Sequence, residues 1–565
     1  ILALEKIILT SYRLRKHEKE GPLSKEETEF IASCDRIQED FPNHKYRAEI
    51  LYKKGELLYN KKQYKDAIPS LQYIIENYPQ SPVYRSALKI AAHANFQNGD
   101  YHTAASEFQQ LVNLCDALEK EEGHKVELFH TRRESQKMLV FSRYKKAEQS
   151  GHAEEFRRIA EEFPKAQVAD VALYEAASLY QKENDYKKAT DVYHYLVKNY
   201  PKSPHAPASL WQIAAFHEKE NDFLKAAKSY EDLFRRYPKF EGALNALYKA
   251  GFLYEKCANW SKEEEMFQLY LSKNPKDRLI EAIFRKGYAQ KEQGKADEAQ
   301  RSFQIAADTY NSLDKKTPGM DAYFAAESQF YLAETYLIQY NNIKIKDLSD
   351  ESTKRKLTLL SELIKSFNKV SEYKVAEWTT NATYIIALAI ENLSEDLLSI
   401  KEAKASDSEY LNTIKLKQKI ADYIKNSISF YKKNIELSSA HSLENEWIEK
   451  SRKKLALNIA RWGNLYEQIA SLIQNAPIPS VLNEAEKKQY KNALAAKAQS
   501  FIKQAVEAYE HNTNAYTWKI RDNEHVTESY KRLSKLAPKR YNREVAEIIH
   551  IPVISENLPD HLYME

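Results

Sequence analysis

Histidine and glutamate are the residue types in this sequence that could bind a metal ion or transfer a proton. Two histidine pairs occur, His124 with His130 and His205 with His217. Their spacings of six and twelve residues differ from the three or four that would place two imidazoles on one helix face for zinc. The run Glu263–Glu265 could supply a general acid only if a pocket shifted a pKa. Packed or solvated histidines and a solvated glutamate face are therefore the favoured interpretations.

The other routes to chemistry are also missing from the sequence. The three cysteines, Cys34, Cys115 and Cys257, are far apart and odd in number, which fits neither a metal site nor a disulfide framework. A phosphate loop needs clustered glycines, and none of the 11 glycines forms a nucleotide motif. No Ser/His/Asp or Cys/His arrangement is visible. We therefore predict no catalytic residue, no metal and no cofactor.

Composition points to a helical chain that folds. With 565 residues, 43% hydrophobic and 29% charged, the sequence suggests several domains or a repeat array. Only 11 glycines and 17 prolines favour helices joined by short turns. The formal charge of +4 gives no case for nucleic acid, and no apolar run approaches the ~18 residues that cross a bilayer. We therefore expect neither a nucleic-acid partner nor a transmembrane segment.

A repeat governs the first half of the sequence. An aromatic residue or asparagine followed by proline recurs at Pro42, Pro79, Pro164, Pro201, Pro238 and Pro275. Four of the separations are 37 residues (for example, 79 minus 42). The separation between Pro79 and Pro164 is 85 residues, so we expect a degenerate unit with extra residues around 111–146.

Positions inside the unit follow a code. Thirteen residues after each proline stands a small residue: Gly55, Ala92, Ala177, Ala214 and Gly251. Twenty-two after stands an aromatic: Tyr64, Tyr101, Tyr186, Phe223 and Trp260. Twenty-five after stands alanine, at Ala67, Ala104, Ala189 and Ala226, with Glu263 as the one departure. Small residues let two antiparallel helices approach, large ones fill the remaining space, and proline ends the second helix. Each unit is therefore predicted to be a helix–turn–helix that stacks on its neighbours.

This spacing resembles the tetratricopeptide repeat, whose usual period is 34 residues. The resemblance implies an all-α, right-handed superhelical solenoid of helix pairs. The three extra residues follow the proline, as in YPQSPVY and YPKSPHAP, which is similar to repeats of bacterial envelope proteins. Ser24 with Glu27 predicts a capping box, and Ile31, Cys34 and Ile37 fit the second helix of a preceding unit. After Pro275 the register slips by one residue and then fades.

The second half stays helical without a strict period. Helices are expected around 326–337, 377–393, 461–471, 484–512 and 526–536, with a Lys/Ser-rich polar insertion or long polar helices at 394–442. The motifs YLAETYL, YNNIKI, NAPIP and SYKRLSKLAP resemble long bacterial periplasmic repeat proteins, including the gliding-motility repeat component. The predicted domains are therefore N-terminal helices at 1–41, an array at 42–316, a helical domain at 317–540 and an extended tail at 541–565.

The predicted binding surface is the concave side, lined by the first helix of each unit. Ten residues after each proline lie Tyr52, Lys89, Tyr174, Trp211 and Tyr248, and Phe252 follows at fourteen. Aromatic rings suit an extended peptide or a partner helix. We assign these six residues to partner binding; the alternative is that some only pad the superhelix.

The leading hypothesis for function is a non-catalytic scaffold or adaptor that binds one or more proteins of a larger assembly. The envelope resemblance implies a periplasmic or outer-membrane-associated complex for motility, secretion or outer-membrane assembly. The sequence opens at Ile1 within a helical pattern, so we expect any export signal or lipid anchor upstream. Two alternatives stay open: a cytoplasmic regulatory repeat protein that binds peptides, and an enzyme with an unrecognised site in the C-terminal half.

Overall fold

The structure is a computed structural model that describes residues 21–123, 125–313, 320–345, 351–400, 407–513, 520 and 523–541. Within these ranges every regular element is a helix. None of these helices is both long and apolar enough to cross a bilayer. The chain divides into two compact units, Ile1–Cys257 and Ala258–Glu565. His124, the N-terminal residues 1–20 and the tail at 542–565 lie outside the described residues.

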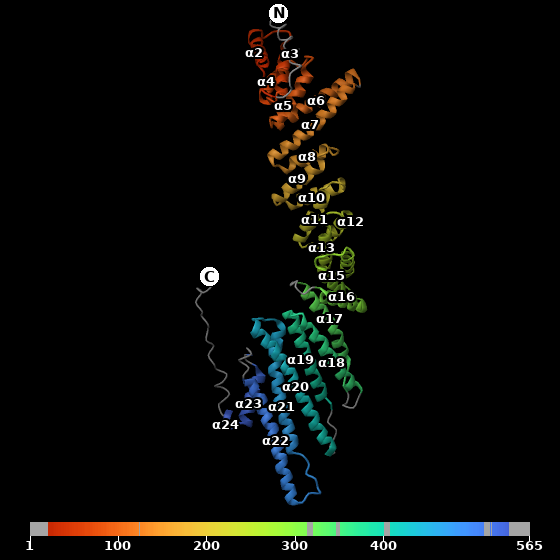
Figure 1. Cartoon of the computed structure of the whole chain (residues 1–565), viewed down its shortest axis with the longest axis vertical. Helices are drawn as coiled ribbons and strands as arrows, with labels where there is room; N and C mark the ends of the chain where they lie inside the picture. The colour runs from red at the N-terminus through yellow and green to blue at the C-terminus, as the bar shows by residue number, and fades with distance from the viewer. Residues whose placement is uncertain are drawn as a thin grey trace. The chain divides into compact units, whose positions relative to one another are not determined.

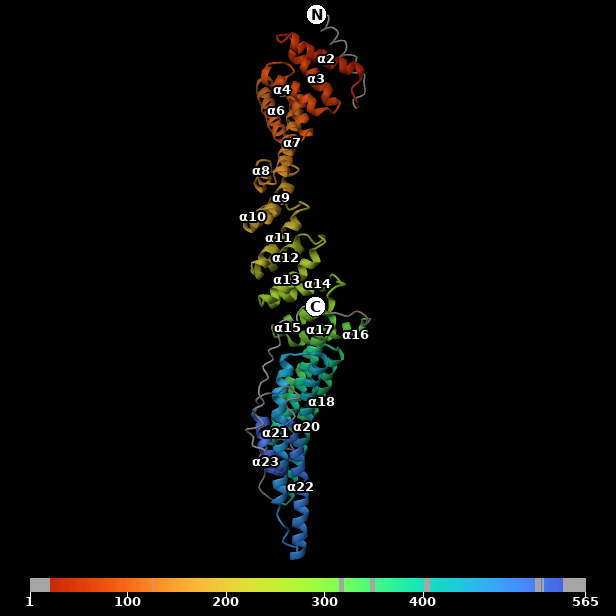
Figure 2. The ribbon, with the colours of Figure 1, turned by 90° about the vertical axis from the view of Figure 1, so that its left-hand side faces the viewer.

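Unit 1 is a succession of antiparallel helices, each packed against the next along the chain (Figures 1 and 2). It consists of α2 (Lys25–Asp40), α3 (Arg47–Asn60), α4 (Tyr64–Asn77), α5 (Tyr84–Gln97), α6 (Tyr101–Glu122), α7 (Val126–Ser150), α8 (Ala153–Glu162), α9 (Ala169–Lys182), α10 (Tyr186–Asn199), α11 (Ala206–Lys219), α12 (Phe223–Arg236) and α13 (Ala243–Lys256). In the regular units the first helix begins five residues after the proline and the second helix begins at the predicted aromatic residue. The predicted helix–turn–helix units and their all-α solenoid fold are confirmed.

Local sequence explains where these helices begin. The side chains of Asp100, Asp185 and Asp222 each accept a hydrogen bond from a backbone N–H in the first turn of the following helix. Ser24 and Glu27 form the predicted reciprocal capping box at the start of α2. Short polar side chains before an aromatic residue thus fix the start of most second helices.

The small residues of the code lie where two helices approach closely. A Cβ atom added to Gly55 would stand 2.6 Å from Cγ of Leu71 on the partner helix, which is closer than side chains tolerate. Ala92, Ala177 and Ala214 occupy the same position in later units, and all three are fully buried. Close helix approach therefore depends on the absence of a larger side chain at this one position.

The connectors between units are tied to one another by tyrosine hydroxyls. The hydroxyl of Tyr200 donates to the carbonyl oxygen of Pro164 at 2.8 Å. One unit later, Tyr237 donates to the carbonyl oxygen of Pro201 at 3.0 Å. In these two units the tyrosine before proline therefore links its own connector to the preceding connector, which gives the lengthened loop a structural role there.

The predicted degenerate unit is a pair of helices of unequal length. α7 has 25 residues, whereas α8 has only 10. The preceding helix, α6, extends to 22 residues and packs along α7 as a long hairpin. Arg132 of α7 pairs with Asp116 of α6 across this hairpin. Because α8 is short, it leaves part of the α7 surface to be covered by the connector that follows.

Unit 2 begins with helices of repeat length and continues with longer ones. It consists of α14 (Trp260–Leu271), α15 (Leu279–Glu292), α16 (Ala296–Ser312), α17 (Met320–Asn342), α18 (Glu351–Glu372), α19 (Ala376–Leu398), α20 (Asp407–His441), α21 (Glu446–Gln474), α22 (Glu484–Thr513), α23 (Glu524–Leu536) and α24 (Pro538–Tyr541). The long helices α19 to α22 lie side by side, each packed on the next (Figures 1 and 2). A single hydrophobic core runs through α17 to α23.

The Lys/Ser-rich stretch contributes directly to this core. Residues 407–441 of the stretch form α20, which packs between α19 and α21. Its Ile420, Ile424 and Tyr431 side chains are almost completely buried in the shared core. The stretch is therefore part of an integral helix, with exposed lysines such as Lys425 and Lys433 on its outer face and Ser427 and Ser438 buried.

Two hydrogen-bond clusters in unit 2 have the same design. Asn434 on α20 donates to the carbonyl oxygen of Thr380 and to the hydroxyl of Ser451. Asn512 on α22 donates in the same way to Ala456 and Ser529. The two asparagines are 78 residues apart (512 minus 434), as are the two serines (529 minus 451). α20 and α22 therefore occupy equivalent places in a second, longer repeat.

A tyrosine one turn earlier completes each cluster. Tyr431 donates to Glu391 at 2.6 Å, and Tyr509 donates to Glu467 at 2.7 Å. The next helices also begin alike, because Asn445 caps α21 and Asn523 caps α23. Unit 2 is thus periodic in its buried polar residues, although its apolar residues show no strict period.

Candidate functional site

The six residues predicted to bind a partner all lie on first helices of unit 1. They are Tyr52 on α3, Lys89 on α5, Tyr174 on α9, Trp211 on α11, and Tyr248 and Phe252 on α13. Every one of them is partly exposed. The repeat therefore places these side chains on the first helices of its regular units and leaves each one partly accessible to solvent.

The two residues nearest the N-terminus are held by local partners. The Tyr52 hydroxyl donates to Glu56 one turn later at 3.1 Å. Burial, followed by the charge of Glu56, raises the pKa of Tyr52 to about 12, so its hydroxyl stays protonated. Lys89 forms an ion pair with Glu134 of α7 at 2.7 Å. Its charge is therefore balanced within the protein.

In the middle of unit 1, Tyr174 and Trp211 each contact a neighbouring aromatic ring. Tyr174 stacks on His205, with ring centroids 4.7 Å apart and an interplanar angle of 27°. Trp211 meets Tyr230 of α12 edge to face, with centroids 5.1 Å apart. Both rings remain half-buried, so packing and partner binding can use different parts of the same side chain.

The last of the six residues belongs to a cation–aromatic cluster. The Lys256 ammonium lies 5.0 Å from the ring centroid of Phe252 and 4.8 Å from that of Phe223. Tyr248 is half-buried one turn earlier on α13. A cation held over two rings keeps this end of the surface both apolar and positive.

A cavity of about 210 Å³ opens beside these helices, between α9, α10 and α11. Its lining comprises Gln181, Tyr186, Ala189, Thr190, Tyr193, Gln212, Ala215, Phe216 and Lys219. Tyr186 and Phe216 stack with centroids 5.9 Å apart, and the Lys219 ammonium lies 3.9 Å from the Tyr186 centroid. These groups offer a flat apolar contact, a positive charge and amides for hydrogen bonding.

Sequence reasoning named only part of this cavity. Tyr186 and Ala189 were identified, but only as packing positions of the repeat. Gln181, Gln212 and Phe216 were not singled out. They differ in type from their counterparts in other units, so the repeat code carries no signal for them. They lie on α9 and α11, the same helices as the predicted Tyr174 and Trp211, and this proximity is the signal that could have found them.

A family model described as "Tetratricopeptide repeat" matches residues 49–81, 171–203 and 281–310. These segments coincide with the helix pairs α3–α4, α9–α10 and α15–α16. The chain contains tetratricopeptide repeats. The third match also confirms that the repeats continue past Pro275, where Gly287 stands against Ser302 and Phe303 after the predicted one-residue slip.

Solved structures of tetratricopeptide-repeat proteins resemble the chain at low identity. The TPR2AB-domain:pHSP90 complex of yeast Sti1 is 16% identical and covers 51% of this chain and 98% of its own, with a TM-score of 0.25. A tetratricopeptide repeat protein from Parabacteroides merdae is 13% identical and covers 61% and 98%, with a TM-score of 0.21. The P58(IPK) TPR domain is 11% identical and covers 70% and 98%, with a TM-score of 0.19. No curated protein matches the chain.

One expectation about the glutamate run, that Glu263 is solvated, was wrong. Glu263 was expected on a solvated face, but its side chain is fully buried. It occupies the position that holds alanine in the other repeats, which faces the helix-packing interior. Glu264 contacts Lys295, Gln290 and Gln293, and Glu265 pairs with Lys262. The three glutamates therefore point to different surroundings and form no common site.

Glu218 and His217, on α11, take part in the packing of the repeats. Glu218 accepts a hydrogen bond from Tyr230 at 3.1 Å and pairs with Lys249 of the next helix pair at 2.8 Å. Burial and the charge of Glu218 raise the pKa of Tyr230. Burial lowers the pKa of His217. Among the described residues, no group of three or more His, Cys, Asp or Glu side chains is arranged to hold a metal ion.

Unit 2 also holds a buried carboxylate beyond the matched tetratricopeptide repeats. Glu391 is 1% exposed and accepts from Tyr431, Lys454 and Arg461 at 2.6 to 3.0 Å. Burial and the neighbouring Glu391 charge raise the pKa of Tyr431, which keeps its hydroxyl as the donor. This carboxylate joins α19, α20 and α21, so its contacts are those of a structural cross-link.

Proposed function

We propose that this protein is a non-catalytic scaffold that holds a partner protein along the first helices of its tetratricopeptide repeats. The observation that carries the proposal is the row of half-buried rings at one register position, Tyr174, Trp211 and Tyr248. These rings lie on the helices that border, or follow, the cavity beside Phe216. An extended segment or a partner helix would cover the exposed edges and place a side chain in that cavity.

Photocrosslinking in the native cell tests where the partner binds. A benzophenone side chain at position 174 or 211 should capture a protein partner. The matched control is position 195, because Tyr195 is an exposed tyrosine on the second helix α10. Equal capture from position 195 would contradict the assignment of the binding face.

Substitution of two rings tests whether the same surface supplies affinity. The double variant Trp211→Ala and Tyr248→Ala should weaken binding of the captured partner by roughly 10-fold or more, because aromatic anchors dominate interface energies. Helix content by circular dichroism should change little, since both rings are only half-buried. If the variant loses helix content but its folded fraction still binds the partner normally, then these two rings stabilise the fold and do not contribute to binding.

We further propose that the scaffold works in a bacterial cell-envelope complex, at the periplasmic side or at the outer membrane. The support for this proposal is the lengthened connector after the proline, as in YPQSPVY and YPKSPHAP, which resembles that of envelope repeats. Cell fractionation tests the proposal. Recovery with the envelope fraction is expected; recovery only from the cytoplasm would favour a regulatory repeat protein that binds peptides there.

A further inference from the structure

The largest departure from regular repeats in unit 1 encloses a second cavity. It measures about 440 Å³ and lies between α7 and the connector from α8 to α9. The cavity arises where the 10-residue α8 leaves the 25-residue α7 uncovered. Its volume falls within the range of ligand pockets, ~300 to 1,000 Å³. It is lined by none of the six residues predicted to bind a partner.

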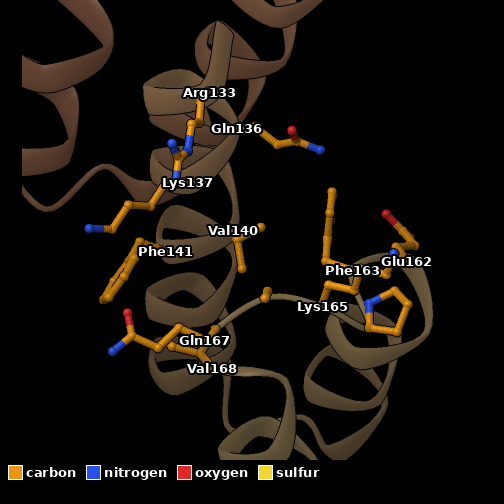
Figure 3. A pocket seen from close by; sticks show the side chains of 12 residues that line it. Arg133, Gln136, Lys137, Val140, Phe141, Glu162, Phe163, Lys165, Gln167 and Val168 are labelled. Carbon is orange, nitrogen blue, oxygen red and sulfur yellow. The ribbon is translucent and has the colours of Figure 1, made fainter. Parts of the chain in front are cut away.

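The walls of this cavity are largely apolar. Val140 of α7 and Phe163 of the connector lie on opposite sides, and Gln167 and Val168 close one end (Figure 3). Phe141 adds a second ring from α7. Val140 is 5% exposed, so this wall is continuous with the core of the unit. The shape suits a bulky apolar side chain.

Positive charge surrounds these apolar walls. Arg133, Lys137 and Lys165 line the cavity, are exposed, and have no carboxylate partner among the residues that the structure describes. The single carboxylate of the lining, Glu162, pairs with Arg143. The Arg143 guanidinium also lies 5.2 Å from the Phe163 ring centroid. Three cations therefore line the cavity beside one carboxylate, which Arg143 already neutralises.

We infer that this cavity is a second docking site, which binds an acidic segment of a partner protein through one bulky apolar side chain. The ring or branched side chain enters between Val140 and Phe163. Carboxylates on either side of it meet Arg133, Lys137 and Lys165. A free phosphate would leave the apolar walls unused, and a nucleic acid would need a longer basic surface. The combination of apolar walls and unpaired cations therefore favours an acidic peptide.

Fluorescence anisotropy on the full chain tests this site directly. The probe is a fluorescein-labelled peptide with one phenylalanine flanked on each side by three glutamates. The double variant Arg133→Glu and Lys137→Glu should lower its affinity roughly 10-fold, and added salt should weaken binding to the unsubstituted protein. Replacing the peptide phenylalanine by serine should also weaken binding. The variant Phe141→Ala should reduce the advantage of the phenylalanine peptide over the serine peptide.

The neighbouring connectors supply a matched control. Lys202 and Lys239 follow Pro201 and Pro238 just as Lys165 follows Pro164, and both are exposed. The double variant Lys202→Glu and Lys239→Glu carries the same change of net charge and should leave peptide affinity within about two-fold of the original. An equal loss in this control would overturn the site, as would the absence of binding to the unsubstituted protein. Binding to anionic phosphatidylserine vesicles in place of the peptide would assign the cations to a membrane surface and also overturn it.

Discussion

Glycine at the contact between two helices sets how closely they approach. Gly463 of α21 lies against the ring of Tyr509 on α22, and an added Cβ would stand 2.6 to 2.8 Å from the ring carbons. Gly55 has the same relation to Leu71 in unit 1. In both the tetratricopeptide repeats and the longer repeat of unit 2, glycine thus leaves room for a large side chain on the facing helix.

The variant Gly463→Ala is therefore expected to destabilise the protein by ~1 to 3 kcal/mol, because the methyl group overpacks the contact with Tyr509. Chemical denaturation followed by circular dichroism measures the change. In a Tyr509→Leu background the same substitution should have a smaller effect, since the facing ring is gone. Equal effects in both backgrounds would show that the ring is not the obstacle.

Glu107 makes stability depend on pH. Its side chain is 4% exposed and accepts a hydrogen bond from Asn95 at 2.8 Å. Burial raises the pKa of Glu107 from 4.5 to about 7. Between these values the folded state keeps the proton and the unfolded state releases it. Stability should therefore fall as pH rises from 4.5 to 7 and level off above pH 7.

The variant Glu107→Gln replaces the titrating carboxyl with a neutral amide. It should be more stable than the original protein at pH 8, by up to ~3 kcal/mol, and similar in stability at pH 4. Thermal denaturation at the two pH values measures the difference. Glu76→Gln is the control, because Glu76 is an exposed glutamate on α4. A pH profile that Glu107→Gln leaves unchanged would assign the titration to another group.

At the scale of elements, the connectors contribute hydrogen bonds of their own. The variant Tyr237→Phe removes the bond to the Pro201 carbonyl but keeps the ring. We expect it to lower the free energy of unfolding by ~0.5 to 1 kcal/mol, the usual contribution of one hydrogen bond. Tyr195→Phe on the exposed face of α10 should have no effect by the same denaturation assay. Equal effects would mean that the bond to Pro201 adds nothing.

Helix positions in the repeats could be predicted from the sequence, whereas the cavity between α9, α10 and α11 could not. The residues at Gly55, Tyr186 and Ala226 recur because the packing of two helices imposes the same requirement in every unit. Phe216 and Gln181 line a cavity through contacts between units, where each unit differs. The burial of Glu263 was also mispredicted, because a glutamate side chain is usually exposed to solvent whereas this position of the repeat is buried.

The periodicity of the C-terminal half was missed for a different reason. Asn434 and Asn512 carry it, and both are polar residues whose partners lie on other helices. A search for recurring small and aromatic residues does not detect buried amides. The helix predicted at residues 484–512 nevertheless agrees with α22 to within one residue at each end.

At the scale of the whole molecule, each helix mainly contacts its neighbours in sequence, so damage should remain local. The variant Ala226→Leu overpacks a fully buried position between helices of one repeat. Hydrogen exchange should become faster in α11 and α12, while α19 to α22 keep their protection. Uniform loss of protection throughout the chain would instead show a single cooperative unit.

The tyrosine bonds between connectors also set how the solenoid responds to force. The bonds from Tyr200 to Pro164 and from Tyr237 to Pro201 join successive turns of the stack at one edge. Because α9 to α12 cannot be pulled apart without lengthening these bonds, we expect them to stiffen the solenoid. We expect a scaffold under tension to yield earlier at the connector that carries Phe163 than at those that carry Tyr200 and Tyr237.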